Sequence, residues 1–165
     1  MEGAYFIAGC QLQGQSGHEA GYALLRQLYL THVGTELPPI LREAGGKPYF
    51  PHSPWHFSIT HTRRHAFCVL ADRPVGIDAE ELDRKVNPAL GEKILSPNEY
   101  TQYLNAKDRN RALLTFWVLK EAAAKCTGEG LRGYPNQTDF SLEDIRVKEM
   151  NGCLVAVIKE NDYAF

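Results

Sequence analysis

The chain has 165 residues, of which 44% are hydrophobic and 23% are charged, and this composition excludes a disordered chain or a fibre. Such a length provides one sizeable core, or two small halves that share one. The formal net charge of -2 argues against a general nucleic-acid binder. Any bound anion must therefore be held by a local cluster of Lys, Arg and His.

The sequence also carries no pattern of a membrane, secreted or metal-ribbon protein. The longest apolar stretch, residues 112–124, contains Lys120 and Glu121 and is too short and too charged to span a bilayer. The start of the chain lacks the features of a signal peptide, so we expect a cytoplasmic protein. The four cysteines are scattered, which predicts reduced, packed thiols. No helical pattern surrounds His61 and His65, so this pair is not predicted to bind a metal.

The first half of the chain reads as one helix followed by short strands. Apolar residues recur at helical spacing over His18–Val33, and Gly34 provides a stop. Residues 37–46 hold two prolines and two glycines and predict a loop. Strands are expected at 57–60, 66–70 and 75–80, with a turn at 72–74 that separates two halves of the chain.

The second half begins with two helices and ends with a hairpin. Ser96 followed by Pro97 and then Glu99 is a capping box and predicts a helix start. A longer helix is expected from Asp108 to Gly128. Asn151-Gly152 predicts a turn between two alternating strands within residues 144–159. The sum is an α+β fold.

Asp78 and Glu80 end the strand at 75–80. Residues two apart on a strand point to the same face, so both carboxylates project together. Their mutual repulsion is relieved by a cation, and oxygen ligands of this kind suit Mg²⁺. A solvated strand end is the alternative, since Glu81 and Asp83 are acidic too.

The helix at 108–126 is apolar almost all the way round, which indicates burial. Lys120, Glu121 and Lys125 nevertheless lie within it, and a buried ion without a partner costs several kcal/mol. An exposed ion pair between Glu121 and Lys125 contributes only ~0.3–0.5 kcal/mol and does not account for them. A carboxylate that joins Asp78 and Glu80 at a metal, beside a lysine for a phosphate oxygen, does.

Two segments carry a resemblance to a known family. Val75-Gly76-Ile77-Asp78-Ala79-Glu80 and Trp117-Val118-Leu119-Lys120-Glu121-Ala122-Ala123-Ala124-Lys125 resemble the G-[IV]-D-x-E and W-x-x-K-E-[AS]-x-x-K signatures of the 4′-phosphopantetheinyl transferase superfamily. Upstream, Gly46-Lys47-Pro48-Tyr49-Phe50 and Phe57-Ser58-Ile59-Thr60-His61-Thr62 look like segments of its larger, two-half members, which activate peptide and polyketide synthetases. In the second, Ser58 and Thr60 stand where Asn and Ser are usual.

The resemblance implies a role for each matching residue. Asp78, Glu80 and Glu121 would hold Mg²⁺, or Mn²⁺, with the pyrophosphate of coenzyme A. Glu121 would also be the general base, directly or through water, for a serine of an acyl or peptidyl carrier protein. Lys125, and with it Lys120, would contact the phosphates, so that Asp78, Glu121 and Lys125 form the catalytic set. The 3′-phosphate end of coenzyme A would be gripped by Lys47, Thr60 and His61.

The same resemblance implies a fold of two similar α/β halves, residues 1–73 and 74–165, that form a pseudo-dimer within one chain. Since one chain supplies both sides of the site, we expect a monomer without nucleic-acid or membrane partners. Two alternatives stay open. The N-terminal half is short, and Arg26 is the one Lys or Arg before position 42. The short half favours a non-catalytic protein that binds coenzyme A or a carrier. A different metal-dependent phosphoryl enzyme could use the same carboxylates.

Overall fold

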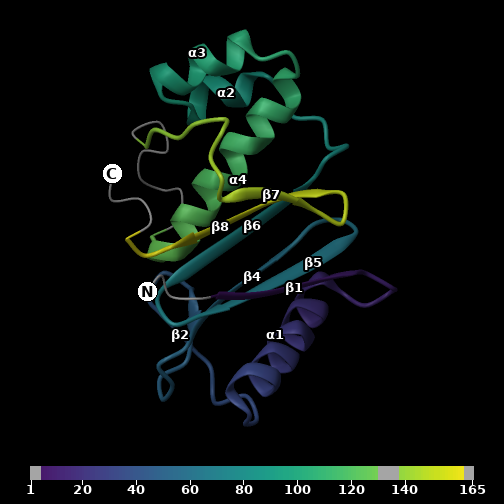
Figure 1. Cartoon of the computed structure of the whole chain (residues 1–165), viewed down its shortest axis with the longest axis vertical. Coiled ribbons are helices and arrows are strands. Elements are labelled where there is room, and N and C mark those ends of the chain that lie inside the picture. Colours follow the sequence, from purple (N-terminus) through teal and green to yellow (C-terminus); the bar gives the residue numbers. More distant parts are fainter. Residues whose placement is uncertain (1–4, 130–137, 162–165) are drawn as a thin grey trace.

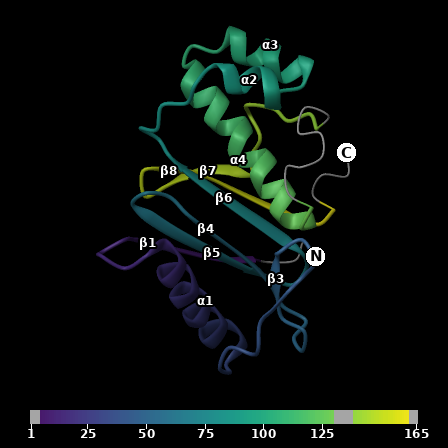
Figure 2. The same ribbon diagram turned by 180° about the vertical axis from the view of Figure 1, so that it is seen from behind.

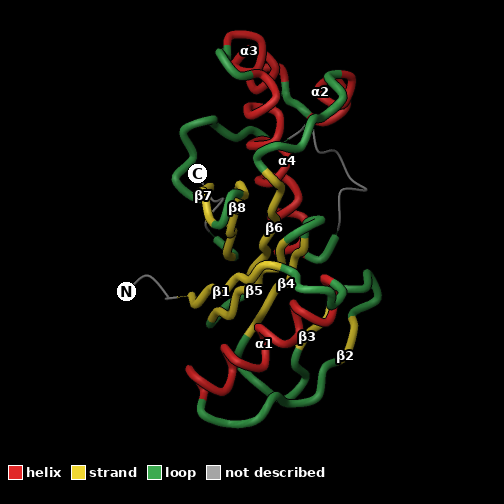
Figure 3. Tube along the Cα trace, turned by 90° about the vertical axis from the view of Figure 1, so that its right-hand side faces the viewer, coloured by secondary structure: helices red, strands yellow, loops and turns green. Residues whose placement is uncertain are grey.

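The computed structural model describes residues 5–129 and 138–161. Two three-stranded antiparallel sheets pack face to face, and a long helix covers the outer face of each (Figures 1 and 3). The first sheet holds β1 (Tyr5–Gln11), β4 (His56–His61) and β5 (His65–Ala71), with α1 (Gly17–Val33) against it. The second sheet holds β6 (Val75–Glu81), β7 (Val147–Met150) and β8 (Cys153–Lys159), with α4 (Arg109–Thr127) against it.

Both sheets have the same strand order. In each, the last strand along the chain is central, the first strand lies at one edge and the middle strand lies at the other. The first sheet is ordered β1-β5-β4 and the second β6-β8-β7. In each unit the helical segment follows the first strand and precedes a hairpin of the other two. The edge strands β4 and β6 lie beside each other, and their side chains meet at the candidate site described below.

Four short elements complete the chain. The small β2–β3 pair lies beside the first unit in the view from behind (Figure 2), and α2 and α3 pack at the far end of α4 (Figure 1). Their bounds are Leu41–Arg42 for β2, Pro48–Tyr49 for β3, Ala89–Ile94 for α2 and Pro97–Asn105 for α3. No helix in the described ranges is both long and apolar enough to cross a membrane.

The alternation of the strands divides the core into three layers. On β5, Phe67 and Val69 face the second sheet, while Cys68 and Leu70 face α1. On β6, Ile77 and Ala79 lie in the inter-sheet layer, and Asp78 between them faces α4. This parity places Asp78 and Glu80 on the helix side of β6.

The predicted helices and the hairpin are confirmed. The first helix begins one residue earlier than expected, and its C-cap Gly34 has φ 87°. The capping box joins Ser96 and Glu99 in both directions. At the hairpin turn, Asn151 and Gly152 have φ of 54° and 77°. The predicted loop at 37–46 is confirmed except for the two residues of β2.

Three features differ from the sequence-based expectation. Strand β1 and helix α2 were not predicted, since neither has a strong periodic pattern or a capping signal. Strand β8 was expected to alternate, yet all its residues, Cys153–Lys159, are buried. It is the central strand of its sheet and is covered by α4 on one face and by the first sheet on the other, so it has no solvated side.

Candidate active site

Helix α4 lies directly against β6 because Gly76 has no side chain. A Cβ at this position would lie 1.9 Å from the carbonyl oxygen of Ala122 and 2.5 Å from the amide nitrogen of Cys126. No larger residue allows this approach of helix and strand. Glu121 precedes Ala122 and Lys125 precedes Cys126 on the helix, so the close packing brings both side chains near Asp78.

Asp78 is the centre of the site. Its side chain is buried, and its Oδ1 accepts hydrogen bonds from Lys125 Nζ at 3.1 Å and from Thr60 Oγ1 at 3.3 Å. Lys125 Nζ also donates to the carbonyl oxygen of Ile77 at 3.1 Å. Oδ2 of Asp78 is buried without a hydrogen-bond partner among the residues that the structure describes. A buried carboxylate oxygen without a partner is costly, and a cation at this point would remove the cost.

The carboxylates of this region disfavour one another's ionised form. Burial raises the pKa of Asp78 to about 6, although Lys125 opposes the rise, and the charges of Glu121 and Glu80 add to it. The pKa of Glu121 is also raised, first by burial and further by Glu80, with Lys125 acting in the opposite direction. Three carboxylates therefore share one electrostatic environment, in which one lysine supplies part of the compensating charge.

Glu80 has a partner of its own. Its side chain forms an ion pair with Arg84, four residues further along the chain. The ligand atoms of Asp78, Glu80 and Glu121 do not all lie within 4.8 Å of one another. Within residues 5–129 and 138–161, the set of three acidic, histidine or cysteine side chains that meets this criterion is His65, Glu81 and Cys153. The oxygen donors and the orphaned Oδ2 fit Mg²⁺, but convergence of the three carboxylates on one ion stays a prediction.

A pocket of about 240 Å³ is bordered by Lys125, whose ammonium group contacts Asp78. Glu121 and Lys125 line it from α4, and Ser58 lines it from β4. The remaining lining residues come from the β2–β3 segment, from β4 and from the end of α4: Gly45, Lys47, Pro48, Phe57, Ile59, Ala124 and Gly128. Glu121 thus faces a cavity rather than the core, which leaves its carboxylate accessible to a ligand.

Lys47 ties the β2–β3 segment to the second unit. Its Nζ donates to the carbonyl oxygens of Cys126 at 2.9 Å and Val75 at 3.3 Å. Burial lowers its pKa, and the charges of Cys126, Glu43 and Glu160 act against that effect. The side chain lines the pocket, but its ammonium group already stabilises the end of α4, so a grip on the 3′-phosphate stays a prediction.

Thr60 and His61 lie on opposite faces of β4. Thr60 is buried and contacts Asp78, as described above, whereas His61 is exposed. His61 packs on the start of α1, where a Cβ at Gly17 would lie 2.3 Å from its ring. It lines a separate groove of about 1030 Å³, together with Arg63, Glu80 and other charged residues. Lys47 and His61 therefore line different cavities.

Lys120 does not line the pocket bordered by Glu121 and Lys125. Its Nζ lies 2.8 Å from Glu99 Oε1 and 3.0 Å from the carbonyl oxygen of Thr138, and both charged side chains are fully buried, at 1% and 0% exposure. The expectation that Lys120 contacts phosphate is corrected accordingly: its charge is part of a structural ion pair. Glu99 also accepts from the backbone of Ser96 and Phe140, so the pair is well satisfied.

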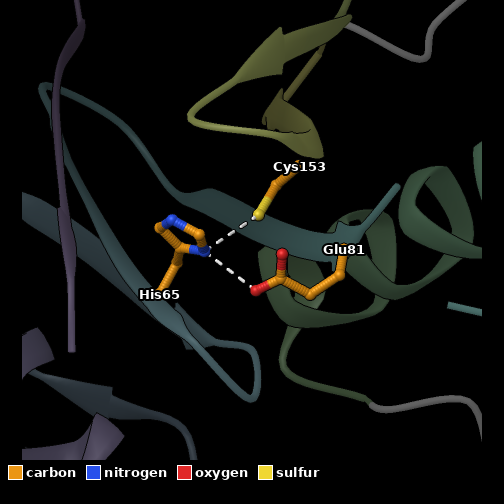
Figure 4. Close-up of side chains that lie close together, drawn as sticks. All are labelled: His65, Glu81 and Cys153. Carbon is orange, nitrogen blue, oxygen red and sulfur yellow. Dashed lines mark hydrogen bonds and ion pairs between the residues drawn. The ribbon is translucent and has the colours of Figure 1, made fainter. Parts of the chain in front are cut away.

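Sequence reasoning missed the surroundings of Glu81. Glu81 Oε1 lies 2.8 Å from His65 Nδ1 (Figure 4). The same oxygen accepts from Thr62 Oγ1 at 2.6 Å, and Oε2 accepts from Arg64 at 3.1 Å. Burial acts to raise the pKa of Glu81, but these hydrogen bonds outweigh it and lower the pKa to about 2. The available signal was parity, since Glu81 shares its strand face with Ile77 and Ala79 and must point between the sheets.

Comparison with known proteins places the chain in a family. Residues 74–161 match the family model described as the 4′-phosphopantetheinyl transferase superfamily. The chain is 34% identical over 123 residues to 4′-phosphopantetheinyl transferase psf-1 of Bacillus pumilus, an alignment that covers 68% of this chain and 52% of that protein.

Two further relatives agree. A 4′-phosphopantetheinyl transferase of Bacillus subtilis is 37% identical over 93 residues, which cover 52% of this chain and 39% of that protein. HetI of Nostoc sp. is 30% identical over 122 residues, which cover 68% of this chain and 52% of that protein. The chain spans about half the length, or less, of these relatives. The chain belongs to the 4′-phosphopantetheinyl transferase superfamily.

Proposed function

We propose that this protein transfers the 4′-phosphopantetheine moiety of coenzyme A to a serine of an apo carrier protein in a Mg²⁺-dependent reaction that releases 3′,5′-ADP. Support comes from the family membership and from the similarity of the chain to 4′-phosphopantetheinyl transferases. The single observation that carries the proposal is Asp78: a buried carboxylate with one orphaned oxygen, beside Lys125 and a pocket lined by Glu121.

The proposed metal ligands are Asp78, Glu80 and Glu121. The ion would neutralise the pyrophosphate and the charge that develops on it. Glu80 would exchange its partner Arg84 for this ligand set. Lys125 would hold Asp78 Oδ1 in place and donate to a phosphate oxygen, since its ammonium group borders the pocket.

Glu121 is proposed as the general base. Its carboxylate faces the pocket, and burial raises its pKa, which makes it a better proton acceptor than an exposed glutamate. It would accept the proton of the carrier serine, directly or through water. The serine oxygen then forms a bond to the β-phosphorus of coenzyme A, the bridging P–O bond breaks, and its electron pair leaves with 3′,5′-ADP.

We further propose that residues 1–73 and 74–165 are two equivalent halves of a pseudo-dimer that acts as a monomer. The identical strand order of the two sheets supports this view. Lys47, Thr60 and His61 of the first half would bind the 3′-phosphate end of coenzyme A, with Thr60 acting through its contact with Asp78.

The direct experiment incubates the protein with coenzyme A, Mg²⁺ and an apo carrier protein and follows the mass of the carrier. A gain of one phosphopantetheine arm is expected for the wild type and not for Glu121→Gln. Glu92→Gln, an exposed glutamate on α2, is the matched control and should retain activity. An unchanged carrier mass in the wild type, across a panel of fatty-acid, polyketide and peptide carriers, would refute the proposal.

The two alternatives have distinct outcomes in the same assay. Coenzyme A binding that is indifferent to Mg²⁺ and is followed by no transfer would identify a non-catalytic binding protein. Hydrolysis of coenzyme A without any carrier would identify a different phosphoryl enzyme. Replacement of Mg²⁺ by Mn²⁺ in parallel reactions tests which ion the carboxylates prefer.

A further inference from the structure

A second polar cluster lies at one end of the inter-sheet core, apart from the candidate active site. His65 of β5, Glu81 of β6 and Cys153 of β8 turn toward one another there (Figure 4). Their ligand atoms all lie within 4.8 Å of each other, with His65 Nδ1 2.8 Å from Glu81 Oε1 and 3.6 Å from Cys153 Sγ. The rest of this layer is apolar, so three polar side chains at one point require a physical reason.

The arrangement does not suit nucleophilic catalysis by the thiol. In a Cys-His-acid triad, the thiol and the acid contact different nitrogens of the imidazole. Here both groups face the same atom, His65 Nδ1. Burial, followed by the charge of Glu81, also raises the pKa of Cys153 to about 12, so the thiol is a poor nucleophile without a cation beside it.

Three different donor atoms that converge on one point are instead a metal-ligand set. Zn²⁺ bonds of about 2.0–2.3 Å to nitrogen, oxygen and sulfur in a tetrahedron separate the ligand atoms by roughly 3.4–3.6 Å. The nitrogen–sulfur separation of 3.6 Å already agrees with this value, and the nitrogen–oxygen pair at 2.8 Å must open by about half an ångström. Nitrogen with thiolate selects a borderline metal over Mg²⁺.

We propose that His65, Glu81 and Cys153 bind a divalent transition metal of the zinc class and that this ion joins the two sheets. Binding releases the thiol proton of Cys153 to solvent, and the proton that His65 Nδ1 donates to Glu81 moves to Nε2 of the same ring. The lone pair of Nδ1 and Oε1 of Glu81 are then available to the ion. The three protein ligands leave a fourth position for water. None of these ligands lines the pocket bordered by Glu121 and Lys125, although Glu81 lines the groove that also contains His61 and Glu80.

The surroundings of the cluster are those of a metal site. Arg64 holds Oε2 of Glu81 at 3.1 Å and Thr62 donates to Oε1, so the carboxylate is fixed in orientation. Hydrogen bonds of this kind around a ligand raise metal affinity. Glu81, Thr62 and Arg64 also line the groove of about 1030 Å³, which gives an ion access from solvent. Cys153 and His65 are covered by the sheets, which keeps competing water away.

The test uses tag-free, chelator-treated full-length protein titrated with Co²⁺. The wild type should bind about one ion and develop a thiolate-to-cobalt charge-transfer band, which excess Mg²⁺ does not remove. Cys153→Ser should abolish the band, and the matched variant Cys10→Ser, at a half-buried cysteine on the other side of the first sheet, should keep it. Absence of the band in the wild type, or its persistence in Cys153→Ser, overturns the proposal.

A second readout covers the event that Cys153→Ser does not fold. The Co²⁺-loaded His65→Gln variant should lack the intense visible absorption of four-coordinate Co²⁺, and its metal binding should be weaker by at least about tenfold. Equimolar Zn²⁺ should raise the melting temperature of the wild type and of Cys10→Ser, and leave that of His65→Gln unchanged. An equal rise in all three proteins would assign the ion to another site and overturn the proposal, whatever the outcome of the carrier assay.

Discussion

Lys125 Nζ lies 3.1 Å from Oδ1 of Asp78, while Oδ2 of the same carboxylate is buried without a hydrogen-bond partner in the described part of the chain. Lys125 therefore satisfies one oxygen of the buried carboxylate, and the other oxygen is left for a ligand. The contact joins α4 to β6 and exists only because Gly76 lets the helix approach the strand.

Gly76→Ala should destabilise the protein by about 3 kcal/mol or more, because the new Cβ would collide with the backbone of Ala122 and displace α4. Transfer activity should fall with it, since Glu121 and Lys125 move away from Asp78. Urea denaturation followed by circular dichroism measures the loss. Gly91→Ala is the control: its nearest neighbour is a side-chain atom of Leu95 at 3.6 Å, and a helical alanine should be neutral or stabilising. Equal stability of the two variants would contradict the packing argument.

Asp78→Asn should abolish carrier modification while the fold persists. The substitution keeps the shape and the acceptor for Lys125 and Thr60 but removes the buried charge that the proposed Mg²⁺ neutralises. Without the ion, the variant should melt at the same temperature as the wild type or higher. Activity is measured by carrier mass and stability by calorimetry in magnesium-free buffer. Full activity of Asp78→Asn would remove this residue from the ligand set.

The raised pKa of Asp78 gives the metal-free protein a defined pH dependence. The folded-state pKa is about 6, above the ordinary value of 3.8, so the folded state holds this proton more tightly than the unfolded state. The stability that Asp78 contributes is therefore complete below about pH 4 and is lost as pH rises through 6. Relative to Asp78→Asn, the free energy of unfolding of the wild type should fall by about 2 kcal/mol between pH 4 and pH 7. A difference that stays constant or grows in this range would contradict the prediction.

Lys120→Met should destabilise the fold by about 3–5 kcal/mol, because it leaves the buried carboxylate of Glu99 without its ion-pair partner. The double variant with Glu99→Gln should recover part of the loss. At temperatures where Lys120→Met is folded, its KM for coenzyme A should equal that of the wild type. The exposed Lys93→Met is the control and should have no effect on stability. A raised KM in Lys120→Met would restore the phosphate role that we have withdrawn.

His61→Ala tests the proposed grip on the 3′-phosphate. If the imidazole binds this group, the variant should raise the KM for coenzyme A about tenfold, as loss of a hydrogen bond to a charged group does. Dephospho-coenzyme A, which lacks the 3′-phosphate, should then serve wild type and variant equally poorly. An unchanged KM for coenzyme A would confine His61 to its packing against Gly17.

Local patterns in the sequence were sufficient for much of the fold. The helices at 17–33, 97–105 and 109–127 and the turn at Asn151-Gly152 follow from periodicity, capping and turn chemistry, which involve residues close in the chain. The same holds for the parity that puts Asp78 and Glu80 on one face of β6. The resemblance to a family, carried by two short segments, is confirmed by the match of residues 74–161 to the family model.

Only the tertiary structure distinguished the charges of α4. Lys120 and Lys125 are five residues apart, so their side chains point about 140° apart around the helix axis. One meets Glu99 on α3 and the other meets Asp78 on β6. The meeting of His65, Glu81 and Cys153 depends in the same way on three strands from both sheets. Sequence periodicity states which face a side chain occupies, but the identity of its partner is decided by how the two sheets and their helices pack.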